Sequence, residues 1–340
     1  MKILVTGSNG FVGGYIVNEL LNNDYSVVGI DNFSKYGKVL KSYDDNPKYL
    51  FKEGDCKNSQ LIYELLEGCD YIIACAAMIG GISYFHEFAY DLIAENERII
   101  ASTFDAAIKR FKKGSLKKII VLSSSMVFEN STIFPSSEDD LKKTPSPLST
   151  YGFQKLSTEY FAKGALEQFG LPYTIVRPFN CVGIGEGRAI SDKDIMSGNV
   201  KLALSHVLPD LIQKILKGQN PLKILGSGSQ IRHYTHGKDL ARGIRLAIES
   251  PLAKNEDFNI STDKSTTVLE LARMVWNCIH KGNLPFKYEL EKGFEYDVQK
   301  RIPDTSKAKR LLNFEAEIKI QDSISEVTEW ISNEIKHNRM

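Results

Sequence analysis

The sequence predicts an α/β protein built on a doubly wound parallel sheet, with a smaller α/β lobe toward the C-terminus. Short apolar runs rich in Val and Ile alternate with amphipathic stretches, which is typical of buried parallel strands covered by helices on both faces. A glycine-rich turn joins the first apolar run to the first amphipathic stretch. The 340 residues, 42% of them hydrophobic, suffice for a large core and exclude collagen-like, disordered and small disulfide-bonded classes.

Five buried strands and three helices can be placed along the first half of the chain. The strands are expected at residues 2–6, 26–30, 71–75, 118–122 and 173–176, and the helices at about 11–22, 91–112 and 150–169. Because helices separate successive strands, the strands should pair in parallel. Long helices that flank such a sheet often pair with a second subunit, so a homodimer is expected.

The alternation of strands and helices breaks down after Asn180. Three glycines between residues 183 and 187 and a polar run to residue 199 interrupt it, so the second lobe is expected to begin there. Helices should follow at about 205–217 and 238–250, and a strand near 257–260 should return to the first sheet. The first domain is therefore predicted to comprise residues 1–180 with about 229–260, and the second, discontinuous lobe 181–228 and 261–340.

Charge and cysteine content narrow the class of partner. Lys plus Arg number 43 and Asp plus Glu 42, so a net charge of +1 provides no bulk attraction for nucleic acid or an anionic membrane. No apolar run approaches the roughly 20 residues that cross a bilayer, and Met1 leads straight into the first strand without room for a cleaved signal, so a cytoplasmic protein is expected. The five cysteines show no C-x-x-C spacing, which predicts neither a disulfide framework nor a metal site.

The segment Gly7-Ser8-Asn9-Gly10-Phe11-Val12-Gly13 lies directly between the first strand and the first helix. Glycines there permit the tight turn, let the backbone and the helix N-terminus approach a pyrophosphate, and allow the helix to pack closely on the strand, as in Rossmann dinucleotide-binding folds. The next strand ends at Asp31, whose carboxylate suits the ribose hydroxyls and repels a 2′-phosphate. NAD is therefore the expected cofactor, although Lys35 and Lys38 leave NADP open.

Further cofactor contacts are expected where neighbouring strands end. Asp55 lies just past a further strand that ends near Glu53, and it is suited either to the adenine amino group or to an ordinary turn. The small residues Ala74-Cys75-Ala76-Ala77 end the next strand and would let the backbone lie against the cofactor. The expected cofactor-binding residues are Gly7, Asn9, Gly10, Phe11, Val12, Gly13, Asp31, Asn32, Asp55, Cys56, Ala74, Ala76, Tyr151 and Lys155.

Tyr151 and Lys155 are spaced so that both side chains lie on one face near the start of a helix. A tyrosine with a pKa near 10 is a poor base at neutral pH, but a lysine ammonium one turn away and a nearby nicotinamide cation favour the phenolate and should lower its pKa. Ser123, Ser124 and Ser125 follow the strand at 118–122, at the carboxyl edge where ligands bind in such folds. This combination suits a proton acceptor for the oxidation of an alcohol.

Together these motifs resemble the extended short-chain dehydrogenase/reductase superfamily, in its NAD-dependent nucleotide-sugar epimerase/dehydratase branch, over essentially the whole chain. The matching segments are residues 7–13, 31–32, 123–128, 151–155, 177–180, 226–239 and 301–304. The resemblance implies that Ser124 orients the sugar hydroxyl, that Tyr151 is the base, and that Lys155 binds the nicotinamide ribose while lowering the tyrosine pKa. It also implies that the first domain binds NAD and that the second lobe binds a nucleotide-diphosphate sugar.

Two local segments, 76–82 and 205–209, look most like the group of GDP-fucose synthase and GDP-mannose 3,5-epimerase. Those enzymes place a cysteine after the catalytic serine as an acid or base, and this chain has Ser125 there, which argues against cysteine-dependent chemistry at C3 or C5. The 4,6-dehydratases and decarboxylases carry carboxylates at positions that Ser125 and Met126 occupy here. Dehydration and decarboxylation are therefore disfavoured.

A sugar nucleotide carries a diphosphate, and a chain with a net charge of +1 needs local cations to bind it. By the same resemblance, Arg232 and Arg301 match the family's diphosphate-binding arginines, and Asn180 matches its strand-end asparagine. His206, at the start of a helix, is expected to bond the phosphate or the sugar or to act as a second acid. The expected substrate-binding residues are Ser124, Ser125, Asn180, His206, Arg232 and Arg301.

The function that these residues favour is NAD-dependent C4 epimerisation of a nucleotide sugar. Tyr151 would remove the C4 hydroxyl proton, a transient 4-keto sugar would form, and hydride would return to its other face from tightly bound cofactor. One alternative keeps the fold but makes the protein a 4-keto-sugar reductase or 3,5-epimerase with His206 as acid. An alternative of another class is a non-catalytic NAD-binding scaffold, against which the intact set of Ser124, Tyr151 and Lys155 argues.

Overall fold

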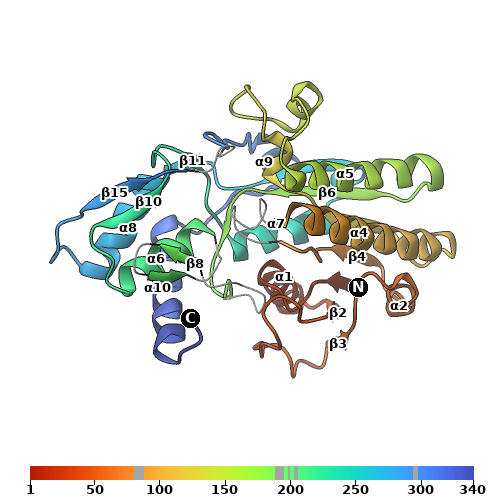
Figure 1. Ribbon diagram of the computed structural model, residues 1–340. Coiled ribbons are helices and arrows are strands. Elements are labelled where there is room, and N and C mark those ends of the chain that lie inside the picture. The colour runs from red at the N-terminus through yellow and green to blue at the C-terminus, as the bar shows by residue number, and fades with distance from the viewer. Residues whose placement is uncertain (80–87, 188–194, 198–199, 203–205, 294–297) are drawn as a thin grey trace.

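A seven-stranded parallel sheet forms the centre of the first domain, as the computed structural model in Figure 1 shows. The structure describes residues 1–79, 88–187, 195–197, 200–202, 206–293 and 298–340. The strand order is β13-β6-β5-β4-β1-β2-β3, so the chain winds outward from β1 in one direction and then returns to build the other half. The predicted fold class is confirmed. The strands are β1 (Lys2–Thr6), β2 (Ser26–Asp31), β3 (Tyr49–Glu53), β4 (Tyr71–Ala74), β5 (Lys118–Leu122), β6 (Tyr173–Pro178) and β13 (Glu256–Ile260).

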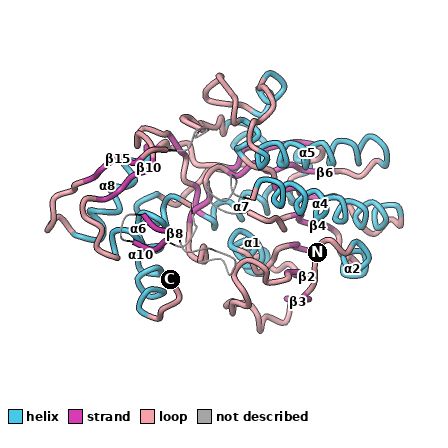
Figure 2. Tube along the Cα trace, in the orientation of Figure 1, coloured by secondary structure: helices cyan, strands magenta, loops and turns pink. Residues whose placement is uncertain are grey.

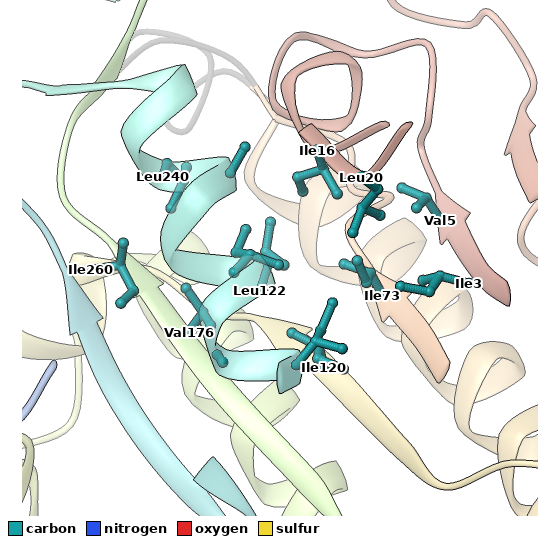
Figure 3. Packing of buried hydrophobic residues seen from close by; sticks show 14 of the residues in the cluster. Ile3, Val5, Ile16, Leu20, Ile73, Ile120, Leu122, Val176, Leu240 and Ile260 are labelled. Atoms are coloured by element: carbon teal, nitrogen blue, oxygen red, sulfur yellow. The ribbon is translucent and has the colours of Figure 1, made fainter. Parts of the chain in front are cut away.

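Helices cover both faces of this sheet because side chains alternate along each buried strand. On one face, α1 (Phe11–Asn22) and α7 (Gly237–Glu249) pack through Ile16, Leu20 and Leu240 onto apolar strand residues (Figure 3). On the other face, α2 (Ser59–Leu65), α4 (Ala89–Lys112) and α5 (Thr150–Phe169) form a second buried cluster. Alanines on α4 and α5 are fully or almost fully buried there, and their small side chains allow a close approach to the sheet.

The second lobe has a core of its own, centred on Trp276. Helices α6 (Val207–Leu216), α8 (Val268–His280) and α10 (Ile320–Lys336) gather around this core, apart from the large sheet (Figure 2). Strand β10 (Leu222–Leu225) pairs in parallel with β15 (Tyr288–Glu291), and β8 (Ile195–Ser197) pairs with β9 (Val200–Leu202). Two further short pairs are β7 (Cys181–Val182) with β12 (Thr235–His236) and β11 (Ile231–Arg232) with β14 (Thr266–Thr267). The remaining elements of the described residues are helix α9 (Ser306–Leu312) and the 3-10 helices η1 (Ser125–Phe128), η2 (Glu138–Lys143) and η3 (Pro251–Ala253).

The observed elements differ from the sequence predictions mainly at their ends and in the second lobe. Helix α4 begins two residues earlier than expected, and α6 begins at Val207; Ser205, where its start was expected, lies outside the described residues. The strand expected near 257–260 is β13, which pairs with β6 at the edge of the sheet. Helix α8 was missed although its start carries a capping box, in which Thr267 and Glu270 bond each other's backbone N–H. Across the described ranges, no helix combines the length and apolar character needed to cross a membrane.

A buried ion network ties α5 to the sheet. The guanidinium of Arg177 on β6 is fully buried and donates from Nε and Nη2 to the two carboxylate oxygens of Glu159 on α5, each at 2.7 Å. Nη2 also donates to Asp257 on β13 at 2.6 Å, and Ser123 donates its hydroxyl to Glu159 at 2.6 Å. Burial alone would raise the pKa of Asp257, but Arg177 and Lys307 lower it to about 2. One arginine therefore joins two strands, a helix and the serine at the end of β5.

Replacing Arg177 by Ala should cost about 3–5 kcal/mol of unfolding free energy, because it leaves the carboxylate of Glu159 buried without its cation. Urea denaturation followed by circular dichroism measures the loss. Lys142→Ala is the matched control, since its ion pair with Asp139 is exposed and its removal should leave the midpoint unchanged. Equal midpoints for the two variants would contradict a supporting role for the buried network.

Candidate active site

The glycine turn after β1 brings the first turn of α1 close to the edge of the sheet. Gly7 has a φ of 69° and donates its N–H to the carbonyl of Ile30 on β2 at 2.8 Å. A Cβ at Gly13 would collide with the carbonyl oxygen of Gly7, so only glycine lets α1 pack this close. No side chain caps the N-terminus of α1, whose N-cap is Gly10. Its first N–H groups and dipole are therefore suited to an anion such as a pyrophosphate.

Asp31 lies at the carboxyl end of β2, beside this turn. One carboxylate oxygen accepts the N–H of Asn9 at 3.0 Å and the other accepts the N–H of Phe33 at 2.8 Å. These two bonds fix the carboxylate while each oxygen keeps a lone pair that can accept from a ribose hydroxyl. Burial lowers the pKa of Lys41, and the charge of Asp31 opposes that effect. Lys41 is therefore a cation near Asp31, and the sequence analysis did not identify it.

The other predicted cofactor residues line the same edge. Thr6 accepts the N–H groups of Cys75 and Ala76 with its hydroxyl, both at 3.0 Å, and this holds the end of β4 against β1. The Cα of Ala76 lies 2.8 Å from where a Cβ on Gly7 would be. The two backbone segments are therefore so close that residue 7 has no room for a side chain. Phe11 and Val12 begin α1, and Ala74 ends β4.

Asp55 is held in a turn, where one carboxylate oxygen accepts the N–H of Lys57 at 2.8 Å. The structure therefore shows the ordinary turn role that the sequence left open; a bond to adenine stays a prediction. Cys56 is buried, and burial raises the pKa of its thiol to about 12, so it contributes as a backbone and packing residue. Asn32 accepts the N–H of Ser34 at 3.1 Å and shapes the loop after β2.

Ser124, Tyr151 and Lys155 come together at the carboxyl end of β5. Ser124 caps η1 by accepting the N–H of Met126 at 3.2 Å, and its hydroxyl also hydrogen-bonds the side chain of Tyr151. Tyr151 lies in the first turn of α5, and Lys155, one turn further on, donates Nζ to the carbonyl of Leu122 at 3.2 Å. All three residues are buried, which excludes bulk water from their polar groups.

Burial is the largest influence on both titrating groups. It raises the pKa of Tyr151, while the hydrogen bond from Ser124 and the charge of Arg301 lower it. It lowers the pKa of Lys155 to about 8. Arg301 is thus a cation that lowers the pKa of Tyr151, one that the i, i+4 spacing did not suggest, while the lowering by Lys155 stays a prediction. Lys155 Nζ donates to the β5 carbonyl of Leu122 and lies 6.0 Å from the tyrosine ring centre.

The two predicted diphosphate arginines come from paired segments. Ile231 on β11 accepts the N–H of Arg301 at 3.2 Å and donates its own N–H to Gln299 at 2.8 Å. Arg232 follows Ile231 and is buried. Val298, in the same segment, packs with Tyr151, Met126 and Leu92, so this segment forms a wall of the site. Asn180 has a φ of 39° and its side chain donates to the carbonyl of His233 at 3.4 Å, which ties the end of β6 to the segment after Arg232.

His206 precedes α6 and is paired with Glu186. The carboxylate of Glu186 accepts the backbone N–H of His206 at 3.0 Å and also bonds Nδ1 of its ring. Burial raises the pKa of Glu186, but His206 and Lys35 outweigh it and the net pKa is lowered. Glu186 therefore orients the imidazole and fixes which ring nitrogen is available. The sequence analysis missed Glu186 because 20 residues separate it from its partner.

Two more residues complete the description of the site. Asn96 on α4 accepts the N–H of Met78 at 2.7 Å and donates to its carbonyl at 2.9 Å, which holds the segment after β4. Residues 80–82 of the predicted 76–82 motif lie outside the described part of the chain. Ser125 is buried at the start of η1, and its part in catalysis stays a prediction. Among the described residues, no three His, Cys, Asp or Glu side chains are grouped so as to hold a metal ion.

Comparison with known proteins agrees with this geometry. The family model for the NAD dependent epimerase/dehydratase family matches residues 3–261. A UDP-glucose epimerase of Bacillus subtilis (strain 168), itself uncharacterised, is 27% identical over 98% of each chain. The crystal structure of UDP-glucose 4-epimerase from Thermotoga maritima with UDP-glucose is 28% identical and covers 98% of this chain and 100% of its own, with a TM-score of 0.80. The UDP-glucuronic acid 4-epimerase of Bacillus cereus, solved with UDP-glucuronic acid and NAD, is 25% identical over 98% of this chain and 99% of its own, also with a TM-score of 0.80.

Gly13→Ala should abolish dinucleotide binding, because the new methyl group must push α1 away from the carbonyl of Gly7 and so displace the N–H groups that face the pyrophosphate. Isothermal titration with NAD measures the loss, expected to exceed a hundredfold. Gly164→Ala on α5 is the control, since a Cβ there meets no neighbouring atom. Retention of NAD affinity in Gly13→Ala would show that this turn is not the cofactor site.

Proposed function

Because this chain belongs to the NAD dependent epimerase/dehydratase family, we propose that it interconverts C4 epimers of a nucleotide-diphosphate sugar. The observation that carries the proposal is the buried cluster of Ser124, Tyr151 and Lys155 at the carboxyl end of β5, across the sheet edge from the glycine turn and Asp31. This cluster contains the groups needed to remove and return a hydroxyl proton. The residues at the glycine turn and Asp31 fit the pyrophosphate and the ribose of NAD.

Residues of the protein itself accept and return the proton of the C4 hydroxyl. Tyr151 accepts the proton of the C4 hydroxyl as a phenolate and returns it after the 4-keto sugar has turned over. Ser124, hydrogen-bonded to Tyr151, holds the reacting oxygen in line with the phenol. Lys155 is placed to bond the ribose next to the nicotinamide. NAD, when bound, supplies the acceptor and donor of hydride at C4.

The nucleotide part of the substrate is assigned to the second lobe. Relatives and structural neighbours that act on UDP-sugars support a UDP-sugar as the substrate class. Arg232 is assigned to the diphosphate, and Arg301 bridges from the diphosphate to the sugar, since it is paired with Ile231 and its charge acts on Tyr151. Asn180 and His206 complete the predicted substrate contacts, and the division of the chain at residue 180 into a cofactor domain and a substrate lobe is part of this proposal.

The alternatives from the sequence are less favoured. A 3,5-epimerase or reductase of the GDP-fucose synthase type needs an acid beside the sugar, and Ser125 offers no thiol there. His206, the substitute acid, would have to act through Nε2, since Glu186 bonds its Nδ1. A non-catalytic scaffold would have no need for a buried tyrosine bonded to a serine, which burial makes costly to maintain.

A homodimer that forms through α4 and α5 is also proposed. Tyr90 on α4 and Phe153 and Tyr160 on α5 are 75%, 49% and 65% exposed, an unusual concentration of aromatic surface on two adjacent helices. Sedimentation equilibrium should give twice the chain mass, and Tyr160→Asp should shift it toward the monomer. A monomeric wild-type protein at micromolar concentration would contradict the proposal. A cytoplasmic location is proposed from the five free thiols.

Tyr151→Phe should lower kcat for C4 epimerisation by about a thousandfold, because it removes the proton acceptor and leaves the fold intact. Proton NMR in deuterium oxide follows the interconversion for UDP-glucose, UDP-glucuronic acid and UDP-N-acetylglucosamine. Tyr160→Phe, an exposed position on the same helix, is the control and should behave like wild type. Deuterium at C3 or C5 would refute C4 hydride return, and full activity of Tyr151→Phe would refute the role of Tyr151 as the base.

A further inference from the structure

Glu129 connects two segments that carry catalytic side chains. It directly follows η1, and its N–H donates to the carbonyl of Met126 at 3.1 Å. Its carboxylate oxygen Oε2 accepts the hydroxyl of Ser149 at 2.7 Å, and both oxygens lie within 3.3 Å of the backbone nitrogen of Ser149. Ser149 is the N-cap of α5 and accepts the N–H of Gly152 at 3.0 Å with the same hydroxyl. A continuous line of hydrogen bonds thus runs from η1 through Glu129 and Ser149 into the first turn of α5.

The ends of this line coincide with the catalytic groups. Ser124 caps the start of η1, and Tyr151 lies between Ser149 and Gly152. Packing at Gly152 is tight, because a Cβ there would lie 2.8 Å from both Glu129 Oε2 and the carbonyl of Met126. The two elements are therefore in close contact at Gly152. The distance between the Ser124 and Tyr151 hydroxyls depends on how α5 sits against η1 at that point.

We propose that Glu129 is a positioning residue, whose carboxylate locks the first turn of α5 onto η1 and so holds the hydroxyl of Tyr151 against Ser124. The role rests on the proposed function, in which Tyr151 is the base. A negative charge at the N-terminus of a helix is also favourable, which strengthens the lock. Twenty residues separate Glu129 from Ser149, so this contact joins distant segments instead of completing a local cap.

A similar contact between a glutamate carboxylate and an N-cap residue occurs at the start of α8, but there both residues belong to a single turn. At the start of α8, the carboxylate of Glu270 accepts the N–H and the hydroxyl of Thr267 at 2.8 and 2.9 Å, within a single turn. The hydroxyl of Thr267 in turn accepts the N–H of Glu270 at 3.1 Å. Glu270→Ala therefore removes the same set of bonds from a helix N-terminus without involving η1 or α5. It reports what loss of capping alone does.

The test compares Glu129→Ala, Glu129→Gln and Glu270→Ala in the NAD-bound protein. The first readout is the pKa of the Tyr151 phenol, taken from absorbance titrations at 295 nm as the difference between each protein and its version with Tyr151→Phe. The hydrogen bond from Ser124 lowers this pKa against burial, and Arg301 and Lys155 are the charged groups that also face the phenol. Weakening that bond in Glu129→Ala should raise the pKa by up to about one unit.

The second readout is steady-state kinetics. Below the pKa of the phenol, a rise of one unit reduces the phenolate fraction tenfold, so kcat of Glu129→Ala should fall about tenfold while KM changes less than twofold. Glu129→Gln should recover most of both effects, since its amide oxygen accepts the same two bonds from Ser149. Glu270→Ala should match wild type in both readouts. The proposal is overturned if Glu129→Ala and Glu270→Ala give the same pKa and the same kcat.

A second pair of variants covers the case in which Glu129→Ala does not fold. Ser149→Ala removes the hydroxyl through which Glu129 acts and should reproduce the raised pKa, whereas Ser149→Thr keeps the hydroxyl and should not; equal pKa values for the two would reject the role. The phenol titration needs no sugar substrate. Absence of C4 epimerisation in the wild type would therefore count against the proposed function, while the titration still decides the role of Glu129.

Discussion

The bidentate pair between Arg177 and Glu159 is the interaction on which the placement of α5 depends. Removing two charges from water is costly, and a fully buried pair is maintained only when its geometry is good and its remaining sites are bonded. The geometry is good here, and Asp257 and Ser123 bond most of the remaining sites of the two partners, leaving Nη1 of Arg177 as the one guanidinium nitrogen without a partner among the described residues. The result is a rigid joint between β6, β13, the end of β5 and α5. Such a joint contributes to position more than to net stability.

The same ion pair helps to hold in place the helix that carries the buried side chains of Tyr151 and Lys155. Tyr151 and Lys155 lie on the same helix as Glu159, so the ion pair holds the middle of α5 to the sheet while Ser149 caps its N-terminus. Burial works against the charged form of each group, raising the pKa of Tyr151 and lowering that of Lys155. Specific neighbours must therefore restore reactivity: Ser124 by a hydrogen bond, Arg301 by its charge. The substrate also depends on specific neighbours. Because the net charge of the chain is only +1, a diphosphate must be bound by local cations.

Sequence reasoning succeeded where a signal is local. The glycine spacing, the apolar runs and the tyrosine–lysine pair are each read within a few residues, and β1, β2, β5, α1 and α5 appear close to where they were expected. It failed for Glu186, Asn96 and Glu129, whose partners are about 20 residues away and whose side chains have no motif of their own. It also missed β10 and β15, where three of the large side chains are exposed and no buried run marks a strand.

The sequence by itself determined the fold class and the glycine turn after β1, and it predicted Asp31 and the three side chains Ser124, Tyr151 and Lys155 that are proposed to act in the site. These follow from short-range rules, because the period of apolar residues and the conformational freedom of glycine act within a turn or a strand. The tertiary structure alone decided which cation acts on Tyr151, which carboxylate orients His206, and how α5 is fixed against η1. These depend on side chains brought together from distant segments, and burial then sets their charges, which no local pattern encodes.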